Sequence, residues 1–448
     1  MPPKKKKKKQ QIPTENELEY ARWVEENVCE LVKVAPKNKF EVFAFASEHA
    51  KEAGITYAHM GTMCETSAGT FCAAFQCSAF GCEGKPGQHI RFSISMDRCE
   101  SWSKTAVPMY GLNALWSPVL HYSEKRDEIF LFYSESRKQL SPGGDIKLIR
   151  TKDEGKSWSE PTTILTHESL GGVPKVIANR VCVGVAPGHL RLPFWTEPTD
   201  SWLRYRDYHP MAENASLLKK VYHSPMGSTD DNNESVYSGT IDSFDEGETW
   251  KTPTMDKLIK FPEHTWLIEN SVVRSLSTYL MYMRSATGEV WYSVSVDDSD
   301  IATPSHVSWS NPKPIPSLPN PNSKVSADMD DVDGSLVFLA LNPSKTKRAP
   351  LGISLRSLDS STLEENCTIK NVFFEIEGDP NGNFSYPTTF RSDLDLYVIY
   401  SVWGVGIRVC RIPSRDVGDA LERAFKALPE QPSILAKPDV AVSTSLFR

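Results

Sequence analysis

The sequence predicts an all-β fold built from repeated units, and three observations support this prediction. Short runs rich in Val, Ile, Tyr and Phe, such as EIFLFYSES at 128–136, alternate with clusters of Gly, Pro, Asn and Asp from Phe40 to Pro413. The 31 prolines, 25 glycines and 11 tryptophans favour many short strands joined by turns. An eight-residue motif recurs within this region, which is typical of an array of supersecondary units.

The bulk properties exclude several classes of protein. A chain of 448 residues can form two or three domains or one large all-β unit. The formal net charge of −7 gives no sign of the excess positive charge that binds nucleic acid. A composition of 40% hydrophobic and 24% charged residues is typical of a soluble globular protein. No apolar run reaches membrane-spanning length. We therefore expect neither a nucleic-acid partner nor a membrane span.

The two ends of the chain differ from its middle. Residues 1–14 predict a disordered basic tail, because the lysines at 4–9 repel one another, and no apolar stretch follows them to form a secretory signal. We expect a cytoplasmic protein, with a nuclear address or a polyanion contact as alternative roles for Lys4–Lys9.

The apolar spacing at 15–35 predicts an amphipathic helix, capped by Thr14 and Glu17 and ended by Pro36. At 414–448, DVGDALERAFKAL predicts a short helix followed by a tail.

The nine cysteines give no sign of a disulfide framework or a metal site. Their number is odd, and no pair of CxxC units stands at zinc spacing. In a chain without an export signal, free thiols are the expectation. We also expect no organic cofactor and no bound metal, because there is neither a Gly-rich phosphate loop nor a metal-spaced His/Cys group.

The recurring motif is complete in SFDEGETW at 243–250. Asp245 can accept backbone N–H bonds at the start of a tight turn, Gly247 supplies a positive φ, and Trp250 folds back as an apolar anchor. The motif therefore predicts a hairpin staple and not a set of catalytic aspartates. Four related copies of the motif recur in the chain. The copy at Ser95 and Asp97 has Cys99 in the glycine place, and the next begins at Thr151 and Asp153. The copy at Ser295 and Asp297 has an insertion before Trp309, and an eroded copy spans Ser354 to Asp359.

These repeats resemble the Asp-boxes of the sialidase (neuraminidase) superfamily. The resemblance implies a six-bladed β-propeller of four-stranded antiparallel blades over residues 38–413, with the N-terminal and C-terminal helices outside it. Three further stretches resemble the superfamily's site. They are LIENSVVRSLSTYLMYMR with Glu269 and Arg284, LNPSKTKRAPLG with Arg348, and GDPNGNFSYPTTF with Tyr386.

The resemblance implies a sialidase-like exo-glycosidase that removes a terminal acidic sugar, sialic acid or a related one, with retention. Planar arginines such as Arg284 and Arg348 suit a sugar carboxylate. A neutral Tyr386 avoids repulsion by that carboxylate and can pass its proton to Glu269; sialidases are known for a tyrosine nucleophile. A second acid must protonate the leaving oxygen. Each residue also has a structural alternative, such as a buried tyrosine with a bonded hydroxyl or an arginine in an ion pair.

The first unit departs from the superfamily pattern. Catalytic sialidases open with a Phe/Tyr-Arg-Ile-Pro segment that carries the first of three arginines, but this chain has Ala58 or His59 there. The nearest carboxylate to the expected acid/base position is Glu83. We therefore count His59 and Glu83 among the catalytic candidates, and a uronic or other acidic sugar as an alternative ligand. By the same resemblance, further residues are expected to line the pocket: Asn113, Trp116, Asn179, Arg180, Glu197, Asn320 and Asn322.

Two other functions compete with glycoside hydrolysis. A uronate polysaccharide lyase would use Tyr386 and His59 as acid and base. A non-catalytic propeller that binds a glycan or a protein would explain the missing first arginine. The sequence leaves the oligomeric state open.

Overall fold

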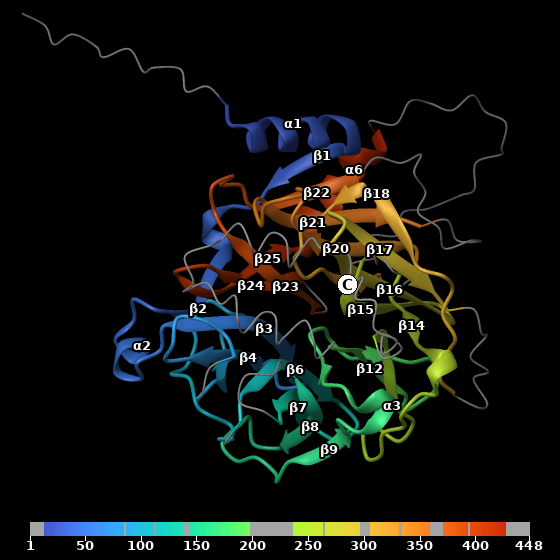
Figure 1. The fold of residues 1–448 in the computed structure, drawn as a ribbon. Coiled ribbons are helices and arrows are strands. Elements are labelled where there is room, and N and C mark those ends of the chain that lie inside the picture. Colours follow the sequence, from blue (N-terminus) through green and yellow to red (C-terminus); the bar gives the residue numbers. More distant parts are fainter. Residues whose placement is uncertain are drawn as a thin grey trace, which may run out of the picture.

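The apolar strands form five hydrogen-bonded sheets in a propeller-like arrangement around a common centre (Figure 1). The computed structural model describes residues 13–84, 87–111, 113–137, 143–197, 236–262, 265–295, 305–330, 334–358, 371–392 and 395–426. The lysine run at 4–9, the polar segment at 228–235, Asp297, Asp359 and the tail beyond Lys426 lie outside these residues.

Two of the sheets contain only consecutive strands, and a third joins β2 from the start of the chain to three consecutive strands near its end. The first contains β3 (Tyr57–Glu65), β4 (Phe71–Ser78) and β5 (His89–Ser95). A second runs β15 (Leu267–Ser275), β16 (Thr278–Ser285), β17 (Glu289–Val294) and β18 (Lys313–Pro319). A third orders β2 (Lys39–Ala44), β25 (Gly406–Pro413), β24 (Asp395–Val402) and β23 (Phe384–Arg391).

The largest sheet has nine strands, in the order β14-β13-β12-β10-β8-β7-β6, with β9 beside β8 and β11 beside β12. Its two halves meet where β10 pairs with β8 at Lys175 and Gly144. The strands are β6 (Leu115–Ser123), β7 (Glu128–Ser136), β8 (Gly144–Thr151), β9 (Thr162–Leu165), β10 (Lys175–Val176), β11 (Cys182–Val183), β12 (Leu190–Thr196), β13 (Tyr237–Ser243) and β14 (Ile259–Lys260).

The five-stranded sheet shows why part of the expected N-terminal helix is a strand. α1 (Glu15–Asn27) begins with the predicted Thr14/Glu17 capping box, but it ends at Asn27. The following β1 (Val28–Lys33) pairs in parallel with β22 (Asn371–Glu377), outside β21 (Leu351–Ser357), β20 (Leu336–Leu341) and β19 (Ser326–Met329). The prediction of a helix to residue 35 was therefore wrong, because strand pairing overrides a weak helical preference.

The remaining helices are short or terminal. α6 (Ser414–Lys426) begins where the closing helix was expected and lies near β1 (Figure 1). α2 (Glu48–Glu52), α3 (Ser169–Gly172) and the 3-10 turns η1 (Pro36–Asn38) and η3 (Met255–Lys257) connect strands. Among the described residues no helix is long and apolar enough to cross a membrane. The eight described cysteines are free, and Cys367 lies outside the described residues.

The Asp-box turns have the geometry that the sequence predicted. Asp245 Oδ1 accepts the Thr249 N–H at 2.8 Å, and Gly247 has φ +80°. Asp97 and Asp153 accept equivalent bonds, and Cys99 adopts φ +73° in the glycine place. The motif also joins neighbouring units, because the Trp250 ring packs edge-on at 5.3 Å against Phe132 of β7, as Trp158 does against Phe92 of β5.

The strands that begin the units converge at the centre, and four of them are interrupted at a comparable point. The register of β3, β6, β15 and β23 shifts two to five residues into the strand. The residues in the shifts adopt positive φ: Met60 (60°), Ser117 (50°), Glu269 (52°) and Tyr386 (56°). A β-bulge re-aims a side chain, and non-glycine residues in this region are strained and cluster at functional sites.

Candidate functional site

The central contact of the site joins Arg284, Glu269 and Tyr386. Arg284 Nη1, at the end of β16, donates to Glu269 Oε1 at 2.8 Å and to Tyr386 Oη at 2.7 Å. The three residues are only 6%, 4% and 8% exposed. Glu269 Oε2 is buried and accepts no hydrogen bond from the described residues. One guanidinium therefore orients both a carboxylate and a phenol in a largely dry environment.

A second arginine completes one side of the site. Arg348 Nη2 donates to the Asn322 carbonyl at 2.9 Å, while Asn322 Oδ1 accepts from Arg284 Nε at 2.6 Å. The guanidinium of Arg348 also lies 5.2 Å from the centre of the Tyr386 ring. Asn322 thus holds the two arginines side by side against the phenol, an arrangement suited to binding one carboxylate.

His59 occupies the first-strand position next to the phenol. Its ring centroid lies 4.1 Å from that of Tyr386, and its Nδ1 is hydrogen-bonded to Ser401 Oγ at 2.8 Å. Burial lowers the pKa of His59 well below its ordinary value, and the nearby Arg348, Lys324 and Arg284 lower it further. His59 is therefore neutral near pH 7 and does not replace the charge of an arginine.

Glu83 belongs to the same site, together with two residues that the sequence analysis missed. Glu83 Oε2 accepts from Tyr57 Oη at 3.1 Å and from Gln76 Nε2 at 3.3 Å. Burial raises the pKa of Glu83; the charge of Glu269 adds to this, while the Tyr57 hydrogen bond and the arginines oppose it. A carboxyl with a raised pKa is suited to donate a proton near neutral pH.

The phenol of Tyr386 is held in its neutral form. Burial raises its pKa well above the ordinary value; Arg284 and Arg348 oppose this increase, and Glu269 and Glu83 add to it. The two cations would stabilise a phenolate if one formed during a reaction.

The remaining residues predicted to line the pocket divide into supporting residues and residues with other contacts. Asn179 donates to the Glu269 carbonyl at 2.8 Å and to the Val325 carbonyl at 3.0 Å, so it fixes the backbone behind the site. Asn320 is fully buried and bonds the backbone of the 320–323 turn and of Asn342. Both amides bond the backbone around the site, while Asn179 Oδ1 is buried without a hydrogen-bond partner among the described residues. That these two residues also line the pocket stays a prediction.

Arg180 has described contacts with residues other than Tyr386. It pairs with Asp328 at 2.7 Å and donates to the carbonyl of Thr389, three residues beyond Tyr386 on β23. It also lies over the Phe390 ring. Its charge is thus paired with Asp328, and no contact between Arg180 and Tyr386 is among its described ones. The expected role of Arg180 in binding substrate stays a prediction.

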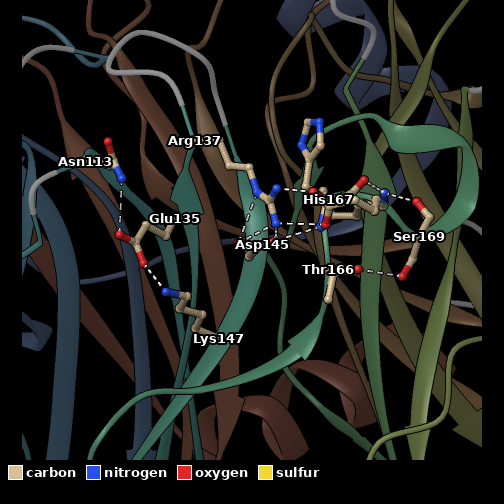
Figure 2. Close-up of polar contacts among 10 residues, drawn as sticks. Asn113, Glu135, Arg137, Asp145, Lys147, Thr166, His167 and Ser169 are labelled. Atoms are coloured by element: carbon tan, nitrogen blue, oxygen red, sulfur yellow. Dashed lines mark hydrogen bonds and ion pairs between the residues drawn. The ribbon is translucent and has the colours of Figure 1, made fainter.

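Asn113, Trp116 and Glu197 have described contacts with other partners. Asn113 reaches Glu135 of β7, and Figure 2 shows it pointing toward that carboxylate, in a charged cluster that includes Lys147, Arg137 and Asp145. Trp116 Nε1 donates to Ser136 of β7 at 2.7 Å. Glu197 accepts from the indole of Trp195, whose ring belongs to the same buried apolar cluster as Tyr386.

The sequence analysis missed three residues at the site, of which two have a weak signal and one has none. Tyr57 stands two residues before His59, so the period of a strand places both on one face. Gln76 interrupts the apolar strand FCAAFQCS. Lys324 is an isolated lysine in a run of small residues, and nothing in its local sequence marks it as buried.

The described residues show no group of three His, Cys, Asp or Glu side chains that could hold a metal ion. The side chains gathered at the site are two guanidinium groups, a neutral phenol, two carboxyl groups and a neutral imidazole.

The sequence of the chain matches a known protein family. A sequence model described as "BNR repeat-like domain" matches residues 69–399. None of the curated proteins compared with the chain is detectably similar to it in sequence.

Solved structures resemble the fold at low sequence identity. A protein of unknown function from Dyadobacter fermentans is 14% identical with a TM-score of 0.60, and the match covers 85% of this chain and 100% of that one. A point mutant of the NanB sialidase from Streptococcus pneumoniae is 12% identical with a TM-score of 0.60, covering 85% and 71%. The leech intramolecular trans-sialidase, complexed with 2,7-anhydro-Neu5Ac, is 11% identical with a TM-score of 0.57, covering 84% and 70%. At these identities the likeness concerns the fold.

Proposed function

Because the chain belongs to the BNR repeat-like family and has a sialidase-like β-propeller fold, we propose that it is a retaining exo-glycosidase that removes a terminal acidic sugar. The observation that carries the proposal is the hydrogen-bonded group in which Arg284 contacts both Glu269 and Tyr386. A merely structural tyrosine does not need a guanidinium on its hydroxyl and a second one 5.2 Å from its ring.

The propeller has six blades in this proposal. The nine-stranded sheet counts as two blades, β6-β7-β8-β9 and β10/β11-β12-β13-β14, joined at the pair Lys175 and Gly144. The other four sheets supply one blade each. Six blades would direct their first strands to one axis, which accounts for the meeting of side chains from β3, β15 and β23. Arg284 joins them from β16, the neighbour of β15.

Binding of the sugar carboxylate falls to the two arginines. Arg348 is half-buried, and its Nη1 and Nε donate no hydrogen bond to the described residues. A carboxylate placed above the Tyr386 ring would take these donors together with the charge of Arg284. The leech neighbour is complexed with a sialic-acid derivative, which supports a sialic acid as the first ligand to test. The absence of a first-strand arginine supports uronic acids as the next.

The reaction would proceed in two displacements. Tyr386 Oη attacks the anomeric carbon and its proton passes to Glu269, whose Oε2 is free of other described partners. The bond to the leaving oxygen breaks as Glu83 gives that oxygen a proton. In the second step Glu83 takes a proton from water, the water oxygen replaces the phenolic oxygen on the sugar, and the proton on Glu269 returns to Tyr386. The overall result is retention at the anomeric carbon.

A second candidate function is glycan binding without turnover. It is favoured by one specific observation: the first-strand position holds the neutral His59, so the anion site has lost a charged member. Under this alternative the same two arginines would bind an acidic sugar, but Tyr386 would serve only as an aromatic platform.

The test is a hydrolysis assay on a panel of aryl α-sialosides and aryl uronides, with the wild type and Tyr386→Phe side by side. The proposal expects turnover of at least one acidic glycoside by the wild type alone. Binding of acidic sugars without turnover would favour the second candidate. Release of an unsaturated product with ultraviolet absorbance would instead indicate a lyase.

A further inference from the structure

A buried lysine lies beside the proposed site. Lys324 precedes β19 and is 1% exposed. Its Nζ donates to Thr388 Oγ1 at 2.6 Å, and Thr388 in turn donates to the carbonyl of Gly61, in the bulge of β3. Among the described residues no carboxylate lies within ion-pair distance of this Nζ. A lysine ammonium is rarely buried without a paired charge, so its retention calls for an explanation.

Charged groups on several strands of the site interact electrostatically with Lys324. Glu269 on β15 and His59 on β3 both sense its charge, and Thr388 is two residues beyond Tyr386 on β23. The guanidinium groups of Arg284 and Arg348 lie 5.8 Å and 5.2 Å from the centre of the Tyr386 ring. Lys324 therefore contributes positive potential close to the strand position that lacks an arginine.

We propose that Lys324 is the third cation of the anion-binding site, supplied from the segment before β19 in place of a first-strand arginine, and that its protonation sets the affinity of the site for a carboxylate. The inference rests on the proposed function in assuming that the ligand is an acidic sugar. Lys324 acts here through its charge, held in place by Thr388, and it makes no bond to the ligand.

The charge balance explains why one proton matters. With Lys324 protonated, three cations face Glu269 and Glu83, and the site attracts an anion even when both carboxyl groups are ionised. With Lys324 neutral, the attraction is weaker by one charge while Glu83 is protonated, and it is lost when both carboxyl groups are ionised, because two cations then face two carboxylates. Burial lowers the pKa of Lys324 to about 7, while Glu269 opposes the decrease. The change therefore falls in the physiological range, with stronger anion binding below it.

The direct test is calorimetric titration with N-acetylneuraminic acid and with glucuronic acid, from pH 5.5 to 8.5. In the wild type we expect Kd to rise on the order of three- to tenfold as pH passes 7. Lys324→Met should bind weakly at every pH, and Lys324→Arg, which stays charged, should bind tightly at every pH. Lys347→Met, which removes an exposed charge next to Arg348, is the matched control and should keep the wild-type pH profile. Parallel pH profiles for the wild type and Lys324→Met would overturn the inference.

A second measurement separates this inference from the proposed function. A lysine whose pKa is lower in the folded than in the unfolded protein gains stability as pH rises between the two values, here from about 7 toward 10.5. The Tm of the wild type should therefore rise relative to that of Lys324→Met by several degrees between pH 6 and 9. If neither sugar binds, the proposed function fails. The pH dependence of the Tm difference then decides by itself whether Lys324 titrates in the folded protein. A difference that changes with pH supports a titrating Lys324, and a constant one overturns it.

Discussion

The guanidinium of Arg284 donates a 2.7 Å hydrogen bond to the hydroxyl of Tyr386, a residue 102 positions later in the chain. The same nitrogen holds Glu269 at 2.8 Å, so two strands that are both bulged at this point present their side chains to one cation. The consequences of this contact can be tested one residue at a time.

Tyr386→Phe should remove catalysis while leaving the fold intact. The phenyl ring keeps its contacts with His59 and Arg348, but the attacking oxygen is gone. We expect kcat to fall by about three orders of magnitude with little change in Tm. Tyr133→Phe is the matched control, since its phenol is also buried, lies in another sheet and has no described hydrogen-bond partner. Equal loss in both variants would contradict the assignment.

The two arginines should differ in their kinetic signatures. Arg348 has no carboxylate partner among the described residues, so Arg348→Met should raise KM about tenfold and change kcat little. Arg284 also orients Glu269 and Tyr386, so Arg284→Met should lower kcat as well as raise KM. Steady-state kinetics of both variants on one acidic substrate provides the comparison. A reversed pattern would show that the carboxylate is bound elsewhere.

Glu83→Gln tests the assignment of the proton donor. The amide cannot protonate a leaving oxygen, so glycosides of alcohols should lose activity by about 100-fold or more. Glycosides of 4-nitrophenol, whose leaving group needs no proton, should lose far less. The wild-type rate should fall as pH rises through the pKa of Glu83, and the variant should lack this alkaline limb. An equal loss on both substrates would assign Glu83 a structural role.

The Asp-box turns should be sensitive to a single methyl group. Gly247 has φ +80°, and a Cβ there would lie 2.6 Å from the Phe130 ring, so Gly247→Ala combines backbone strain with a clash. We expect a loss of about 2–4 kcal/mol in the free energy of unfolding. Gly404→Ala is the control, because Gly404 has a similar φ of +74° but no atom within 4 Å of the position that a Cβ would take. Chemical denaturation of both variants should give a clearly smaller loss for Gly404→Ala.

His121 should make the protein sensitive to mild acid. Burial lowers its pKa to about 4, and the charge of Arg180 contributes. Between pH 6.5 and 4 the unfolded chain therefore binds a proton that the folded protein does not, so stability falls as pH falls through this window. His121→Gln should remove about 1–2 kcal/mol of this dependence. Unfolding free energies at pH 7 and 4.5 check this, and an unchanged slope in the variant would contradict it.

Local sequence predicted the repeating turns and much of the proposed site. The Asp-box offsets fixed the turn chemistry down to the positive φ at Gly247, because that chemistry depends on neighbouring residues. Glu269, Arg284, Arg348 and Tyr386 meet as the resemblance implied. The convergence itself depends on the register shifts in β15 and β23, and no short motif encodes those shifts.

Features that depend on distant partners were beyond the sequence. β1 follows α1 as a strand only because β22, more than 300 residues later, offers it an edge. The resemblance implied that Asn179 and Asn320 line the pocket, but it gave no sign that each is buried and bonds backbone carbonyls through its amide nitrogen. Lys324 is fixed by its contact with Thr388, which only the closed ring brings near.

The measurement that tests the central claim most directly is trapping of the glycosyl-enzyme with a fluorinated, activated acidic sugar, first a 2,3-difluorosialic acid and then a 2-fluorouronic acid. Intact-mass analysis of the wild type should show one added sugar, and peptide mapping should place it on Tyr386. Tyr386→Phe should remain unmodified. Turnover of an acidic glycoside with no adduct, or with the sugar on another residue, would contradict the account.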